Sequence, residues 1–321
     1  MTTVGPRPGA RTDRTSAPLG PAHASVRIDE ARNRIAEQLV GRTHELELVL
    51  AAVSSGRDLV LEGPPGTSKT TILKAITAEW GIDLHFVEGN ADLTPSKLVG
   101  HHNPARVLKE DYSADNFVDG PLVQAMRDGG FLYIEEFNRA PEDTVNTLLT
   151  AMADREISIP RVGVVSARPT FRVIASMNPF DNIGTTRLST SVHDRMCRLA
   201  IGYQPEDAER DVVALRTGAR DRRQVADCVA VTRATREHAD LRQGSSVRGA
   251  IDLLFVLDSL LAMRAHSSSE ETYRTAFFDA MTVALSGRIH VDEAAETTPE
   301  RVLREIWEDH FILDPAEAEP G

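Results

Sequence analysis

The sequence predicts an α/β fold, in which a parallel sheet covered by helices is followed by a smaller domain made of helices alone. Two observations carry this prediction. Up to Tyr203, five short apolar stretches alternate with helical ones, and such alternation favours a parallel sheet with helices on both faces. After Tyr203, apolar residues recur at helical spacing. Because ligands bind at the carboxyl ends of parallel strands, we expect the functional site at that edge of the sheet.

The expected elements follow the chain in order. Residues 1–30 are rich in Pro, Gly, Ser, Thr and Arg and have little to bury, so they are predicted to be a disordered tail. The α/β domain spans 31–203, the helical domain 204–312, and a second disordered tail 313–321. The strands are expected at Asp58–Glu62, Leu84–Glu88, Phe131–Glu135, Phe171–Ser176 and Cys197–Ile201. The later helices are expected within 205–218, 223–241, 246–265, 271–286 and 299–311.

Composition and charge exclude several classes of protein. With 321 residues, 41% hydrophobic and 26% charged, the chain can build two globular cores. No stretch approaches a membrane span, the N-terminus lacks the apolar core of a secretion signal, and Cys197 and Cys228 lie far apart, so we expect a cytoplasmic protein with reduced thiols. The net charge of −12 is spread along the chain, which argues against a general nucleic-acid binder.

The run LVLEGPPGTSKTTI, over 59–72, predicts a phosphate-binding loop. Gly63 and Gly66 let the loop fold around an anion, and the helix that begins at Lys69 directs its positive dipole end to the same place. Lys69 would reach the β- and γ-phosphates, and Thr70 would offer its hydroxyl to Mg²⁺. The usual pattern has glycine directly before the lysine, where this chain has Ser68. The residues expected to contact the nucleotide are Gly63, Pro64, Pro65, Gly66, Thr67, Ser68, Lys69, Thr70 and Thr71.

Two carboxylates end the strand FLYIEEF, over 131–137. In nucleoside triphosphatases of this kind, the first acid holds the Mg²⁺ shell and the second polarises the attacking water. This assigns Glu135 to the metal and Glu136 to the water. The first acid is normally Asp, so the longer Glu135 must reach the metal shell through a different rotamer.

The order of these parts resembles the AAA+ superfamily and, within it, the MoxR-type ATPases with their CbbQ, NorQ and GvpN relatives. The resemblance covers roughly Glu37 to Arg288 and implies a ring-forming ATPase that uses ATP and Mg²⁺. Such rings are usually hexamers that bind ATP between neighbours and remodel a partner, often a protein with a von Willebrand A domain. Beyond the phosphate loop, the matching segments are VEGNADLTPSKLVG (87–100), DGPLVQAMRDGGFLYIEEFNRAPEDTVNTLLTAMADREISIP (119–160), FRVIASMNP (171–179), TSVHDRMCRLAIGY (190–203) and GSSVRGAIDLL (244–254).

The resemblance also assigns three polar residues. Asn178 matches the polar sensor that orients the attacking water, although Asn-Pro is also a common turn starter. Arg195 matches the arginine that crosses to a neighbour's γ-phosphate, and the alternative for Arg195 is a surface ion pair with Asp194. Arg248 matches the second sensor, which reaches the phosphates of its own chain, and the alternative is a solvated arginine at a helix start.

Two further segments resemble family insertions that face the pore or the partner. Residues 101–120 interrupt a predicted helix with polar and turn residues, and 157–171 resemble a hairpin before the polar sensor. Adjacent His101 and His102 point apart and have no third ligand at useful spacing, so they do not predict a metal site.

Three functions agree with these features. The first is an ATP-hydrolysing remodeller that activates a partner or inserts its cofactor. Ser68 and Glu135 leave a second open, a nucleotide-gated scaffold with little turnover. The third is a DNA-associated motor, which the acidic charge disfavours.

Overall fold

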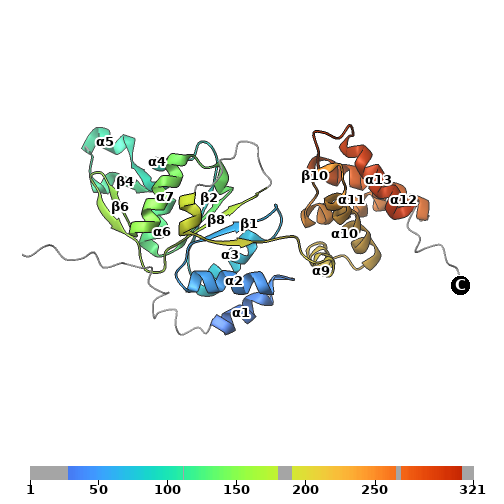
Figure 1. Cartoon of the computed structure of the whole chain (residues 1–321), viewed down its shortest axis with the longest axis horizontal. Coiled ribbons are helices and arrows are strands. Elements are labelled where there is room, and N and C mark those ends of the chain that lie inside the picture. Colours follow the sequence, from blue (N-terminus) through green and yellow to red (C-terminus); the bar gives the residue numbers. More distant parts are fainter. Residues whose placement is uncertain (1–27, 111, 180–189, 265–268, 313–321) are drawn as a thin grey trace, which may run out of the picture.

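The computed structural model describes residues 28–110, 112–179, 190–264 and 269–312, and Figure 1 shows it as an α/β region joined to a helical region. The predicted C-terminal tail, 313–321, lies outside the described residues. So does most of the predicted N-terminal tail, 1–30, but its last three residues belong to helix α1 (Ile28–Ala36).

The α/β region is built on a five-stranded parallel sheet with the order β2-β5-β8-β1-β9. All five predicted strands are present within two residues of their expected bounds. The strands are β1 (Leu59–Glu62), β2 (Leu84–Glu88), β5 (Phe131–Glu135), β8 (Arg172–Met177) and β9 (Cys197–Ala200). This order places β1 beside β8 and β8 beside β5, so the carboxyl ends of these three strands meet at one edge.

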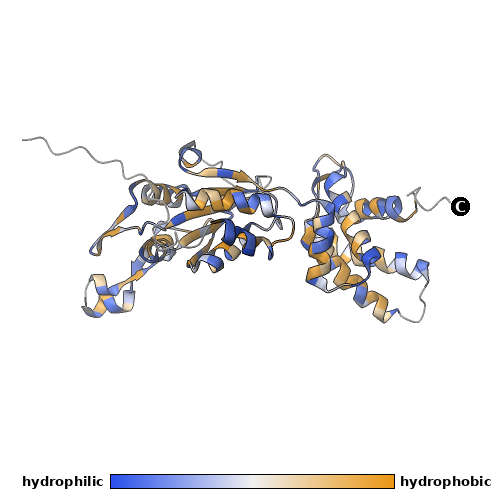
Figure 2. Cartoon of the chain, turned by 90° about the horizontal axis from the view of Figure 1, so that it is seen from below, coloured by the Kyte–Doolittle hydropathy of each residue, from blue (hydrophilic) through white to orange (hydrophobic). Residues whose placement is uncertain are grey.

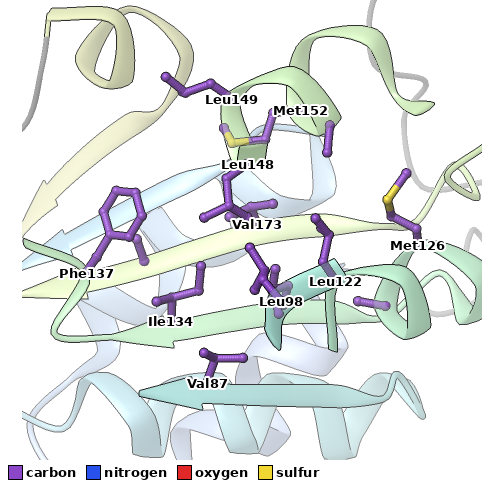
Figure 3. Close-up of a cluster of buried hydrophobic side chains, with 14 of the residues drawn as sticks. Val87, Leu98, Leu122, Met126, Ile134, Phe137, Leu148, Leu149, Met152 and Val173 are labelled. Carbon is purple, nitrogen blue, oxygen red and sulfur yellow. The ribbon is translucent and has the colours of Figure 1, made fainter. Parts of the chain in front are cut away.

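Each face of the sheet has its own core, because successive side chains of a strand point to opposite faces. On β5, Leu132 and Ile134 join one core, whereas Phe131 and Tyr133 join the other. The first core, shown in Figure 3, also takes residues from α4 (Pro95–Val99), α6 (Pro121–Asp128), α7 (Glu142–Asp154) and α8 (Thr190–Arg195). The second takes residues from α1, α2 (Thr43–Ser54) and α3 (Lys69–Trp80).

The two segments that resemble family insertions form small strand pairs outside the main sheet. The first contains β3 (Gly100–His102), α5 (Pro104–Glu110), the short turn η1 (Ala114–Asn116) and β4 (Phe117–Asp119). The second is the hairpin of β6 (Glu156–Ile159) and β7 (Gly163–Ser166). Another short turn, η2 (Phe137–Arg139), follows β5 directly.

The helical region has a separate hydrophobic core, and all five predicted helices are present. In Figure 2 these helices are orange along some sides and blue along others, as expected of helices that bury one face. They are α9 (Glu206–Thr217), α10 (Arg222–Glu237), α11 (Val247–Met263), α12 (Glu270–Leu285) and α13 (Pro299–Phe311), with the turn η3 (Ser286–Arg288) after α12. No helix of the described residues is long and apolar enough to cross a membrane.

The region is not made of helices alone, however. Strands β10 (Leu241–Gln243) and β11 (His290–Val291) pair antiparallel. Sequence analysis missed this pair because strands of two and three residues are too short to show a period of two.

Candidate functional site

The loop between β1 and α3 packs against two other parts of the chain, the segment after β9 and the start of α11. A Cβ on Gly63 would lie 2.0 Å from the carbonyl oxygen of Ile201. Gly66 has a φ of +76°, and a Cβ there would lie 2.5 Å from the hydroxyl oxygen of Ser246, at the start of α11. Both glycines are therefore required by close approach, and the helical region lies against the predicted phosphate loop.

Lys69 is the buried cation of this loop, with only 9% of its surface exposed. Its ammonium donates hydrogen bonds to the carbonyl oxygens of Gly63 (2.8 Å) and Pro64 (2.9 Å) and lies 3.3 Å from the hydroxyl of Thr67. Burial lowers the pKa of Lys69 to about 8, and Glu135 opposes this shift. Among the described residues, no carboxylate forms an ion pair with Lys69, and its hydrogen bonds go to neutral oxygens. A buried ammonium without an ion-pair partner, beside glycines whose backbone leaves no room for a Cβ, fits a phosphate group.

Ser68, at the departure from the usual loop pattern, adopts φ 67° and ψ 14°. This is the left-handed region, which L-residues other than glycine enter at a cost of roughly 1–2 kcal/mol. The conformation explains why glycine is usual at this position. Ser68 adopts the conformation that the loop requires, so its backbone is strained.

The two acids at the end of β5 have different surroundings. Glu135 accepts a hydrogen bond from the hydroxyl of Thr70 at 3.2 Å, so the two groups predicted to hold Mg²⁺ are in contact. Glu136 has a φ of 52° and forms an ion pair with Arg139 at 3.0 Å, with both side chains 41% exposed. A Cβ on Gly89, after β2, would lie 2.4 Å from the carbonyl oxygen of Glu136. The two carboxylates thus have different partners: Glu135 contacts Thr70, whereas the partly exposed Glu136 pairs with Arg139.

Two buried hydroxyls that sequence analysis missed lie behind these acids. The hydroxyl of Tyr133 is 3.1 Å from that of Thr70 and 2.9 Å from that of Ser176, and both Tyr133 and Ser176 are almost fully buried. Tyr133 precedes Glu135 by two residues, and the period of two along a strand places them on the same face. That spacing was the available signal, but the contacts with α3 and β8 needed the strand order.

A cavity of about 620 Å³ joins these parts. It is lined by Gly63, Pro65 and Lys69 of the loop, by residues at the ends of β5 and β8, and by the β10–β11 pair of the helical region. These further lining residues are Glu135, Glu136, Asn138, Arg139, Ser176, Met177, Asn178, Arg242, Gln243, His290, Val291 and Glu293. Lys69, Glu135, Glu136 and Asn178 thus line one cavity, to which Arg242 and His290, not expected from the sequence, also contribute.

The two predicted arginines occupy different places. Arg248, in the first turn of α11, lies near Gly66, and its charge helps to lower the pKa of Lys69, so it belongs to the loop's surroundings. Arg195 does not line the cavity of its own chain. It is exposed and donates a hydrogen bond to the carbonyl oxygen of Ser191 in its own helix, at 3.1 Å, and among the described residues it makes no ion pair with Asp194.

Comparisons with known proteins agree with this geometry. Residues 58–196 match the model of an AAA domain of the dynein-related subfamily. An uncharacterized protein of Staphylococcus haemolyticus is 27% identical over 216 residues, which cover 63% of this chain and 79% of the relative. A relative from Staphylococcus aureus, also uncharacterized, is 27% identical and covers 65% of this chain and 81% of its own length.

Solved structures resemble the chain at the level of the fold. A mutant of RuvB from Thermotoga maritima superposes with a TM-score of 0.50 at 16% identity, covering 80% of this chain and 72% of its own. A putative ATPase from Cytophaga hutchinsonii has a TM-score of 0.49 at 20% identity and covers 87% of this chain and 92% of its own. The chain has the AAA+ fold, and its residues 58–196 are similar to AAA domains, a similarity that implies ATP binding, usually with Mg²⁺.

Proposed function

We propose that this protein is an ATPase of the MoxR type, which hydrolyses ATP as a cytoplasmic ring to remodel or activate a partner protein. The observation that carries the proposal is the buried Lys69 ammonium, which donates hydrogen bonds to neutral oxygens and lines the same cavity as Glu135, Glu136 and Asn178. Such a site supplies a cation for phosphates, acids for a metal and a water, and a polar sensor.

The residues take distinct roles in this proposal. Lys69 and the loop N–H groups bind the phosphates, and Thr70 and Glu135 would hold Mg²⁺, which neutralises charge that develops on the phosphates. Glu136 polarises the attacking water and Asn178 orients it. Arg248 contacts the phosphates from the helical region, whose approach to Gly66 brings its first turn to the loop.

A pair of variants tests the proposal against the scaffold with little turnover. Glu136→Gln keeps the shape of the side chain and removes the base, so it should bind MgATP normally and hydrolyse it about 10²–10⁴-fold more slowly. Turnover by the parent chain with a loss of this size supports the ATPase. Tight binding of MgATP by the parent chain without turnover would instead support the nucleotide-gated scaffold.

Assembly into a ring is supported by the position of Arg195, which lies away from the cavity of its own chain. Delivered by a neighbour, an arginine of this kind is worth roughly 10³–10⁵ in rate. Arg195→Ala should therefore keep ATP affinity and lose turnover. Mixing Arg195→Ala subunits with Glu136→Gln subunits should restore activity at those interfaces that combine an intact Glu136 with an intact Arg195. Confirmed co-assembly without any recovery would show that Arg195 does not act across the interface.

The partner is proposed to be a protein, with one carrying a von Willebrand A domain as the first candidate. The Glu136→Gln variant offers the means to identify it, because a chain that binds ATP without hydrolysing it holds the ATP-bound conformation. Capture on this variant with ATP, compared with capture on Lys69→Ala, should enrich the partner. Equal recovery of the same proteins on both variants would count against nucleotide-dependent remodelling.

A further inference from the structure

A chain of hydrogen-bonded hydroxyls runs from β8 through β5 to α3 and ends on a carboxylate. The hydroxyl of Ser176 lies 2.9 Å from that of Tyr133, which lies 3.1 Å from that of Thr70, and Thr70 donates to Glu135 at 3.2 Å. Ser176 and Tyr133 are almost fully buried, so water does not supply their partners. The four groups come from three elements that are far apart in sequence.

The direction of donation in this chain follows from its charged end. A hydroxyl carries one proton and two lone pairs, and Thr70 uses its proton in the hydrogen bond that it donates to Glu135. Tyr133 can then donate to Thr70, and Ser176 to Tyr133, so that every hydroxyl donates toward the carboxylate. Hydrogen bonds to an ionised acceptor are the strong ones, and successive hydroxyls polarise one another, which favours this arrangement over the reverse.

A tyrosine hydroxyl is protonated at neutral pH, so Tyr133 has a proton to donate to Thr70. The Thr70 hydroxyl donates its proton in a hydrogen bond to Glu135 and accepts one hydrogen bond from Tyr133. Its oxygen therefore retains a single free lone pair. That lone pair is what a threonine offers to Mg²⁺ in a phosphate-binding site.

We propose that Tyr133 and Ser176 are positioning residues that orient the Thr70 hydroxyl and the Glu135 carboxylate as one Mg²⁺-holding unit. The proposal rests on the ATPase function proposed above and goes beyond it by assigning roles to two hydroxyls that contact the metal-holding groups through hydrogen bonds.

This chain of hydrogen bonds from Ser176 through Tyr133 and Thr70 to Glu135, called the relay below, also connects the metal-holding pair to the proposed sensor. Ser176 lies on β8 two residues before Asn178, which directly follows the strand, and Tyr133 lies two residues before Glu135, the last residue of β5. A hydrogen bond between Ser176 and Tyr133 therefore ties the two strand ends that bear the sensor and the first acid. A shift of either strand end would change the geometry of Thr70.

The test is the Mg²⁺ dependence of nucleotide binding in Tyr133→Phe, which removes one oxygen and keeps the ring. Outer partners of metal ligands typically contribute 10- to 100-fold in metal affinity. We expect the Mg²⁺ concentration for half-maximal strengthening of binding of a fluorescent ATP analogue to rise about 10- to 100-fold. Affinity for the same analogue in EDTA should stay unchanged, because Lys69 and the loop are untouched.

A matched control separates this effect from general loss of a buried hydroxyl. Tyr273→Phe removes a hydroxyl that donates to Asp227 at 2.8 Å in the helical region, and it should lower the melting temperature without moving the Mg²⁺ dependence. A double-mutant cycle adds Ser176→Ala. If the hydroxyls act in series, Ser176→Ala should weaken Mg²⁺ dependence in the parent and add little in Tyr133→Phe.

The outcomes distinguish the relay from the function on which it rests. If Tyr133→Phe keeps the parent Mg²⁺ dependence while the parent binds MgATP and turns it over, the relay is wrong and the ATPase stands. If Tyr133→Phe loses affinity equally with Mg²⁺ and with EDTA, Tyr133 has only a structural role. If the parent does not bind the analogue under either condition, the ATPase assignment itself fails and the relay fails with it.

Discussion

The helical region and the phosphate loop each bury a charged group, and the surroundings of these two groups differ. In the helical region, Glu209 is 2% exposed and pairs with Arg233 at 3.1 Å and with Arg236 at 2.8 Å. In the loop, Lys69 is 9% exposed and is held by carbonyl and hydroxyl oxygens. A buried charge that forms ion pairs within the chain stabilises the fold. A buried charge that forms no ion pair is available to bind a ligand of opposite charge. This contrast leads to four predictions, from the largest expected effect to the smallest.

Removal of the charge on Glu209 should destabilise the helical region strongly. Glu209→Gln leaves Arg233 and Arg236 partly buried against a neutral group, and breaking a buried pair in this way costs about 3–5 kcal/mol. Urea denaturation followed by circular dichroism measures the loss. Glu206→Gln is the control, because Glu206 is 42% exposed, and its ion pair with Arg210 should contribute at most about 1 kcal/mol. Equal losses in the two variants would contradict the structural role of Glu209.

Replacement of Lys69 should give the opposite pattern. Lys69→Met should weaken nucleotide binding by 2–5 kcal/mol, or about 30- to 4000-fold, because it removes the cation that faces the phosphates. The stability of the nucleotide-free chain should be unchanged or higher, since an uncompensated buried charge is lost. Calorimetric titration and thermal unfolding measure the two effects. Lys74→Met, at an exposed position of the same helix, should leave nucleotide affinity unchanged. A marked loss of stability in Lys69→Met would show that the ammonium serves the fold.

The pH dependence of the same group should have opposite signs for folding and for binding. Burial lowers the folded-state pKa of Lys69 to about 8, from the ordinary lysine value of 10.5. Between these values unfolding takes up a proton, so the destabilising effect of the buried Lys69 charge decreases, and the stability of the free chain increases, as the pH rises through this window. Bound phosphates raise the pKa of Lys69, so nucleotide affinity should be level below about pH 8 and fall by up to tenfold per unit above it. Calorimetry in buffers of different ionisation enthalpy should detect proton uptake on binding at pH 9. Affinity that is level from pH 7 to 9.5 would contradict the lowered pKa.

The strained residue of the loop gives the smallest effect. Ser68→Gly relieves the left-handed conformation and should stabilise the folded chain by roughly 1 kcal/mol, while Ser68→Ala keeps the strain and should not. Thermal unfolding of the three proteins checks the order. Stabilisation by alanine as well as glycine would mean that the serine hydroxyl, and not the backbone, is the source of the cost.

Much of this molecule could be predicted because the signals were local. The five strands, the loop and the carboxylate pair are each written in fewer than fifteen consecutive residues, where a period of two, a glycine or a Lys-Thr pair has direct conformational meaning. The short strands β10 and β11 carry too few residues for any period. Their presence against the cavity, with Arg242 and His290, was therefore missed.

The sequence by itself determined the AAA+ class of fold, the place of the phosphate loop and the acids that follow β5. Only the tertiary structure decided that Tyr133 and Ser176 stand behind Thr70, that Ser246 lies against Gly66, and that Lys69 has no carboxylate partner among the described residues. The physical reason is the distance along the chain over which each kind of interaction acts. Periodicity and turn chemistry act between neighbours along the chain, whereas the strand order β2-β5-β8-β1-β9 brings together side chains more than 100 residues apart, and the partners of a buried group depend on that order.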